Sequence, residues 1–277
     1  MTARRRLDGP ATFAVVATAL AAVALAVTVV VAAQTRADRT IAGGGYSFDQ
    51  NDTPAAGPVD LNDGPAANPD ADPGEIAQES AEAMAGVTSV EFRLERSGAP
   101  VFIDQFEKLA LDDLLGQFTV PTRARAQLTV TVEGNLITKL GAVAIEDEVW
   151  LSNPVTGDFE TLPAGYDIDP SKFFDPEGGW QPLLANLFDV ELIGIDDRGG
   201  DRYHLRGTAP AAEVRNITVG LVRDQDVPVE LWIHPGTMLV TRAAFTTVID
   251  GGESRWVLDL DRYGEQFSIS PPENVRD

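Results

Sequence analysis

The chain contains no cysteine and only two histidines, His204 and His234, among its 277 residues. The absence of cysteine excludes disulfides, thiolate nucleophiles, zinc ribbons and iron–sulfur clusters, and it removes the residue that is acylated in bacterial lipoproteins. Neither histidine lies in a Gly-x-Ser-x-Gly or His-Glu-x-x-His pattern. The sequence therefore predicts no catalytic residue, no metal site and no cofactor, and we expect the chain not to be an enzyme.

Basic residues are also scarce, because 21 Lys and Arg face 43 Asp and Glu, a net charge of −22. Five arginines and two aspartates give the first 40 residues a net charge of +3, so the remainder carries −25. A surface this acidic repels phosphate backbones and anionic headgroups, so nucleic acid is excluded as an expected partner. The adjacent acids Asp112-Asp113 and Asp196-Asp197 are expected to be solvated charges in loops.

One long uncharged run lies near the N-terminus, from Gly9 to Thr35. Its central part, residues 10–33, exceeds the roughly 20 residues that cross a bilayer, and the arginines at positions 4 to 6 favour a cytoplasmic N-terminus. Residues 1–36 are therefore predicted to form a basic tip and a transmembrane helix that anchors the chain in the cell membrane. The alternative is a cleaved signal, for which Val31-Ala32-Ala33 offers suitable small residues and which would make the protein secreted.

Residues 37–74 are rich in Gly, Pro, Ala, Asn and Asp, which predicts a disordered acidic linker. A helix start signal at Asp72-Pro73 and Glu75 then begins a folded domain over residues 75–277. The domain has two amphipathic helical segments, near residues 75–87 and 178–188, and many segments that alternate apolar and polar residues. These patterns predict an α+β fold, a single curved antiparallel sheet or half-barrel with helices on its concave face.

Eight to ten apolar strand rows with only two short helices to cover them leave space on the concave face. Small residues on these rows, such as Ala124 and Ala126, either leave a cavity or let the helices pack closely. The pattern alone leaves both alternatives open. We take as candidate cavity-lining, ligand-binding residues Phe92, Leu94, Phe118, Ala126, Leu128, Val130, Leu140, Ala142, Ala144, Trp150, Phe174, Leu183, Leu184, Leu187, Leu231, Ile233, Ala243 and Phe245.

Three short stretches occur in a characteristic order across the domain. The first is Phe174-Asp175-Pro176, which leads into Gly179 and Leu184-Ala185-Asn186-Leu187-Phe188. It is followed by residues 227–233, Val-Pro-Val-Glu-Leu-Trp-Ile, and by residues 260–265, Leu-Asp-Arg-Tyr-Gly-Glu, before Pro271-Pro272. In their order and spacing, from about Glu79 to Pro272, they resemble the mycobacterial LppX/LprA/LprF/LprG lipoprotein family.

The resemblance implies a half-barrel similar to the LolA and LolB carriers, with a hydrophobic cavity that holds acyl chains of lipids or lipoglycans. It further implies an extracytoplasmic carrier that moves lipids between membrane and envelope, with a lipid exporter as a candidate partner. Members usually carry a lipobox cysteine, and here a transmembrane anchor would replace it. The alternative function is a cell-envelope interaction domain with a packed core and no lipid ligand.

Overall fold

The computed structural model describes residues 58–103, 107–132, 136–146, 148–153, 156–161, 178–197, 200–218, 222–249 and 252–276. Within these residues, three helices accompany one sheet of twelve strands. The elements in chain order are α2 (Pro73–Ala85), β1 (Ser89–Gly98), β2 (Leu109–Thr119), β3 (Arg123–Val132), β4 (Leu136–Ile145), β5 (Glu148–Ser152), β6 (Phe159–Thr161), α3 (Trp180–Ala185), β7 (Phe188–Asp196), β8 (Arg202–Ala209), α4 (Ala211–Ile217), β9 (Val227–Ile233), β10 (Val240–Ile249), β11 (Gly252–Asp261) and β12 (Val275–Arg276).

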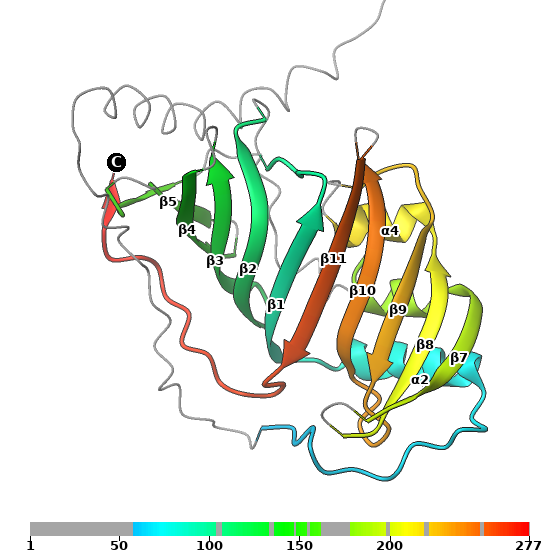
Figure 1. Cartoon of the computed structure of the whole chain (residues 1–277). Helices are drawn as coiled ribbons and strands as arrows, with labels where there is room; N and C mark the ends of the chain where they lie inside the picture. Colours follow the sequence, from blue (N-terminus) through cyan, green and yellow to red (C-terminus); the bar gives the residue numbers. More distant parts are fainter. Residues whose placement is uncertain are drawn as a thin grey trace, which may run out of the picture.

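The sheet joins two antiparallel runs of strands side by side. Its order is β12-β6-β5-β4-β3-β2-β1-β11-β10-β9-β8-β7, and β1 pairs with β11 where the two runs meet. Only the short pair of β12 with β6 is parallel among the described strands. Figure 1 shows the sheet as one curved layer, with α2 and α4 on one side of the half formed by β7 to β10. The predicted single curved antiparallel sheet is confirmed.

The alternation of the strands gives the sheet two distinct faces. We call the face of Val90, Phe92 and Leu94 the inner face, because Val90 packs in the same core as the helices. The opposite, outer face carries Glu91 and Arg93 of the same strand. Side chains alternate at every residue of a strand, and the register of each pair then assigns its neighbours to one face or the other.

Three clusters of buried side chains stabilise the sheet. The helix-covered core lies on the inner face between the helices and β7 to β10, and includes Ile76, Met84, Leu184, Leu205, Leu231 and Ile233. The strand core lies at one end of the inner face and comprises Val101, Leu109, Leu111, Val130, Val132, Leu140 and Trp256. The outer cluster packs the C-terminal segment on the outer face and comprises Val143, Ile145, Trp150, Phe159, Phe267 and Ile269.

Helix α2 begins where its sequence signals place it. The Asp72 side chain accepts a hydrogen bond from the backbone N–H of Glu75 at 2.9 Å, and Pro73 occupies the first turn. Gly86 ends the helix. The apolar stripe that includes Ile76, Ala77 and Met84 is buried, which confirms the predicted amphipathic helix.

Residues 58–71 lie against the domain, and we call them the N-terminal strap. The backbone N–H of Val59 donates to the Tyr263 carbonyl at 3.0 Å, and the N–H of Asn68 donates to the Tyr203 hydroxyl at 3.2 Å. Apolar strap residues pack on the helix-covered core, namely Val59, Leu61, Ala67 and Ala71. The part of the expected linker from residue 58 onward is thus in contact with the fold, whereas residues 37–57 lie outside the described residues.

Two elements differ from the prediction. Asp112 and Asp113 lie in strand β2, not in a loop, and a bulge between Leu111 and Asp113 accommodates them. The Asp112 carboxylate accepts from the Thr131 hydroxyl at 2.6 Å, and the adjacent carboxylate accepts from Thr129 at 3.0 Å. Two threonine hydroxyls on β3 thus donate hydrogen bonds to the two carboxylates. The structure also adds α4 to the two helices that the sequence predicts.

Candidate functional site

A row of very small side chains crosses the inner face on neighbouring strands. Gly116 of β2 pairs with Ala126 of β3, and Ala126 pairs with Ala142 of β4. Both alanines are partly exposed, and neither contributes to the three clusters of the described residues. Because the side chains of this row are small, the surface of the inner face is recessed here.

Large apolar side chains surround this row without being fully buried. They are partly exposed and lie on the inner face of five strands, namely Leu94, Leu114, Leu128, Leu151 and Leu258. Fully buried apolar residues on the same face are found in the helix-covered core and in the strand core. The described residues thus form an apolar surface between two closed cores, which we call the open inner face.

Two aromatic side chains mark the limit of the open inner face. The Phe92 ring lies over Gly116, so closely that a Cβ at Gly116 would come within 2.4 Å of the Phe92 Cζ atom. Phe245 stacks on Trp256 with ring centroids 5.9 Å apart. The Trp256 indole donates to the Thr247 hydroxyl at 2.9 Å, which satisfies its buried N–H.

A charged residue closes the strand core at its end. Arg96 lies on the inner face of β1, and its side chain is only 6% exposed. The guanidinium donates to the backbone carbonyls of Leu111 and Ala99 and lies 3.5 Å from the Asp112 carboxylate. Because protein acceptors hold this guanidinium, we assign Arg96 a structural role.

Most of the candidate residues lie on the inner face or on the helices that cover it. The strand register places on the inner face Phe92, Leu94, Phe118, Ala126, Leu128, Val130, Leu140, Ala142, Ala144, Leu231, Ile233, Ala243 and Phe245. Leu183 and Leu184 of α3, with Leu187 just after it, belong to the helix-covered core. Of this set, Phe92, Leu94, Ala126, Leu128, Ala142 and Phe245 are the partly exposed strand residues.

Two candidates are not brought together with the others. Trp150 pairs with Val143 and is buried in the outer cluster, so it lies on the opposite face of the sheet from Ala142. The reason is the alternation of β5, which places Val149 and Leu151 on the inner face instead. Phe174 lies outside the described residues.

Three partly exposed leucines of the open inner face were not among the residues predicted from the sequence. Leu258 could have been found, because it alternates with Trp256 and Leu260 along β11. Leu151 stands next to Trp150, and only the pairing of β5 with β4 tells which of the two faces inward. Leu114 follows two aspartates in a strand that the sequence did not predict.

Both histidines contact other groups of the protein. The Nδ1 atom of buried His234 accepts backbone N–H bonds from Gly236 at 3.2 Å and Thr237 at 3.1 Å, which fixes the turn between β9 and β10. Burial lowers the pKa of His234, and the nearby Arg202 lowers it further. His204 stacks on Trp232 with ring centroids 4.4 Å apart and lies 3.2 Å from the Glu230 carboxylate on the outer face.

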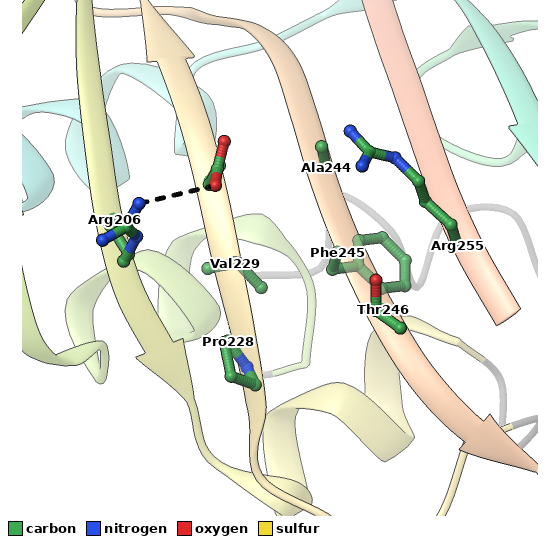
Figure 2. Close-up of a pocket in the computed structure, with 8 residues that line it drawn as sticks. Arg206, Pro228, Val229, Ala244, Phe245, Thr246 and Arg255 are labelled. Carbon is green, nitrogen blue, oxygen red and sulfur yellow. Dashed lines mark ion pairs between the residues drawn. The ribbon is translucent and has the colours of Figure 1, made fainter. Parts of the chain in front are cut away.

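A shallow hollow of about 200 Å³ lies on the outer face, between β8 and β11. Figure 2 shows Arg206 and Arg255 on opposite sides of it, with Ala244 and Thr246 between them. Arg206 is paired with Glu230 at 3.8 Å. This hollow is small and flanked by charges, and it faces away from the open inner face.

A known protein family matches most of the chain. A sequence model of the LppX_LprAFG lipoprotein family matches residues 72–269, which include every described strand except β12. The chain belongs to this family. A sequence search of curated proteins finds no match.

Two crystal structures share the fold. LprF from Mycobacterium bovis superposes with a TM-score of 0.58 at 19% identity, covering 74% of this chain and 99% of LprF. LppX from Mycobacterium tuberculosis superposes with a TM-score of 0.50 at 18% identity, covering 72% of this chain and 100% of LppX. At such low identity the likeness establishes the fold only.

The predicted membrane anchor falls in residues 1–57, outside the described part of the chain. Within that described part, no helix has the length and apolar character needed to span a bilayer. The anchor and the competing cleaved signal therefore both stay predictions from the sequence.

Proposed function

We propose that this chain binds the acyl chains of lipids or lipoglycans on its open inner face and transfers them in the extracytoplasmic space. The observation that carries the proposal is the small-residue row, in which Ala126 and Ala142 lie partly exposed among apolar side chains. Apolar surface of this kind is stabilised when a ligand removes it from water. Membership in a lipoprotein family adds independent support.

The charge of the body is consistent with a ligand that is held by its apolar part. The remainder of the chain beyond residue 40 carries −25, which disfavours recognition through an anionic headgroup. On the inner face, the Arg96 side chain has its acceptors within the protein. We therefore propose that acyl chains, and not headgroup charges, supply most of the affinity.

The N-terminal apolar run completes the proposal. Residues 10–33 are long enough to span a bilayer and would hold the carrier at the membrane in place of the missing lipobox cysteine. Such a carrier works within reach of its tether, and a lipid exporter in the same membrane is the partner that we propose for loading.

The test is binding of a fluorescent fatty-acyl probe to the purified domain. Ala126→Trp and Ala142→Trp place an indole on the small-residue row and should lower the affinity at least about tenfold, with a stability close to that of the wild type. Ala244→Trp is the matched control, because it fills the hollow on the outer face and should leave probe binding unchanged. If the wild type does not bind the probe and both inner-face variants are strongly destabilised, the interior is a packed core and the interaction-domain alternative is preferred.

A further inference from the structure

Exposed large apolar side chains gather at one end of the sheet. Ile137 is 66% exposed, Val248 is 55% exposed and Leu136 is 41% exposed. Phe102 precedes β2, forms a bridge with Ala110 of that strand, and is partly exposed. We call these four residues, Phe102, Leu136, Ile137 and Val248, the apolar rim.

The topology brings the rim residues to the same end. β1 runs toward this end and β2 away from it, so Phe102 lies in their connection. Leu136 and Ile137 begin β4, where Leu136 pairs with the last residue of β3, and Val248 is the last but one residue of β10. From β4 to β10 there are five strand spacings in the sheet order, so the rim extends over roughly 24 Å.

One rim residue, Leu136, lies on the inner face beside the strand core, whereas the register places Phe102, Ile137 and Val248 on the outer face at the same end. Val132 is paired with Leu136, and Val101, in the segment that carries Phe102, is buried against the same cluster. That cluster is packed in turn by Leu94 and Leu128 of the open inner face. An apolar path therefore runs from Leu136 at the rim, through the strand core, to the small-residue row.

We propose that the apolar rim inserts into the surface of a lipid bilayer and so aligns the open inner face with the lipids that it takes up or delivers. This inference rests on the proposed function and names the partner of that same site. Large apolar side chains on separate strands suit a deformable apolar medium, in which each side chain is buried independently. A flat protein partner would leave the gaps between the side chains unfilled.

The charges at this end indicate the kind of bilayer. Glu107 and Glu253 are exposed, and Glu253 is the cross-strand partner of Val248. Both carboxylates would be repelled by an anionic surface, so the rim fits a bilayer of zwitterionic or uncharged lipids. Lys139 is exposed two residues behind Ile137, at a depth suited to headgroup phosphates.

The predicted tether is long enough to allow this contact. The strap begins at the other end of β11, where the N–H of Val59 bonds to Tyr263. The 24 residues between positions 33 and 58 can span at most about 80 Å, whereas a ten-residue strand such as β11 is about 33 Å long. A chain anchored through residues 10–33 can therefore present its rim to the same membrane.

The absence of cysteine provides a direct test in the full-length chain. Ile137→Cys is labelled with an environment-sensitive nitrobenzoxadiazole dye, and the protein is reconstituted into phosphatidylcholine vesicles with or without doxyl-labelled phosphatidylcholine. Val120→Cys is the matched control, because Val120 is 42% exposed at the opposite end of the sheet, just after β2. We expect the dye at position 137 to shift to the blue and to be quenched by doxyl lipid, and the dye at position 120 to show neither change.

Each other outcome overturns the inference. A dye at position 137 that stays aqueous shows that the rim does not touch the bilayer. A blue shift without doxyl quenching indicates a protein contact, such as a second copy of the chain. Quenching at position 120 in place of position 137 shows that the opposite end faces the membrane.

The role of this contact in exchange is measured by transfer of a fluorescent acyl lipid between vesicles. Ile137→Ser and Val248→Ser should slow transfer about tenfold each, whereas Val120→Ser should not. Equal rates for all four proteins would show that the rim does not align the site for exchange. The quenching measurement does not depend on ligand binding, so loss of acyl binding with the rim contact intact would contradict the proposed function alone.

Discussion

The distal end of the Phe92 ring on β1 lies against the backbone of Gly116 on β2. A Cβ at position 116 would stand 2.4 Å from Cζ and 2.7 Å from Cε2 of that ring. Gly116 therefore provides the space in which Phe92 rests, and Phe92 in turn marks the side of the open inner face that adjoins the helix-covered core. A single methyl group added at position 116 would therefore change the geometry of the inner face.

We predict that Gly116→Ala displaces the Phe92 ring and lowers the free energy of unfolding by about 1–3 kcal/mol, as overpacking does. Urea denaturation measures the change. The two residues should also be coupled, so that Gly116→Ala costs much less in a Phe92→Ala background. Additive effects in the double mutant would mean that the ring does not depend on the space above Gly116.

The N-terminal strap should contribute to stability. Removing residues 58–71 exposes apolar surface beneath Val59 and Leu61, and it removes the carbonyl of Leu61 to which buried Arg202 donates. We expect a domain that begins at residue 72 to be about 2–3 kcal/mol less stable than one that begins at residue 58. Deletion of residues 43–57 is the control and should leave the thermal midpoint unchanged. Equal midpoints for all three proteins would show that the strap is not bound in solution.

The stability of the domain should decrease as the pH falls below about 6.5, the ordinary pKa of histidine. Burial lowers the pKa of His234 in the folded state, so the unfolded chain binds more protons in this range and protonation favours unfolding. We expect His234→Asn, which keeps an acceptor for the N–H groups of Gly236 and Thr237, to flatten the dependence of the thermal midpoint between pH 7.5 and 5.5. His204→Asn removes the only other histidine and identifies which ring is responsible.

Asp261 predicts a pH effect of the opposite sign. Partial burial and the facing carboxylate of Glu91, its partner in the register of β1 and β11, raise the pKa of Asp261, although the residue keeps contact with solvent. The ionised form therefore destabilises the fold at neutral pH, and stability is regained as the pH falls through the folded-state pKa. Asp261→Asn should raise the thermal midpoint slightly at pH 7, and this gain should shrink toward pH 4. A gain of the same size from the exposed control Glu253→Gln would indicate a general charge effect.

The fold could be predicted in large part from the sequence because most strands alternate clearly. β3 alternates Ala124, Ala126 and Leu128 with polar residues, and this pattern alone places the alanines on the inner face. β2 escaped prediction because Asp112 and Asp113 interrupt its apolar pattern, and the threonines that satisfy them lie on another strand. The strap escaped because its composition resembles a linker, whereas its contacts are made by a few separated residues such as Leu61.

From the sequence, the site could be predicted only as rows of apolar residues that alternate with polar residues along strands. Periodicity alone cannot tell whether Trp150 or Leu151 faces inward, since both are apolar and adjacent. The register of β5 with β4 decides it, by pairing Ala142 with Leu151. Nor does the sequence reveal that Phe92 rests on Gly116, because that contact joins two strands through their pairing.

We propose above all that lipid acyl chains bind on the open inner face. Native mass spectrometry of the domain, purified without detergent from a bacterium that supplies complex lipids, tests it most directly. We expect the wild type to carry added masses that match acylated lipids, and Ala126→Trp and Ala142→Trp to appear at the mass of the protein alone while Ala244→Trp keeps the adducts. An unliganded mass for the wild type, or adducts that persist in both inner-face variants, would contradict the account.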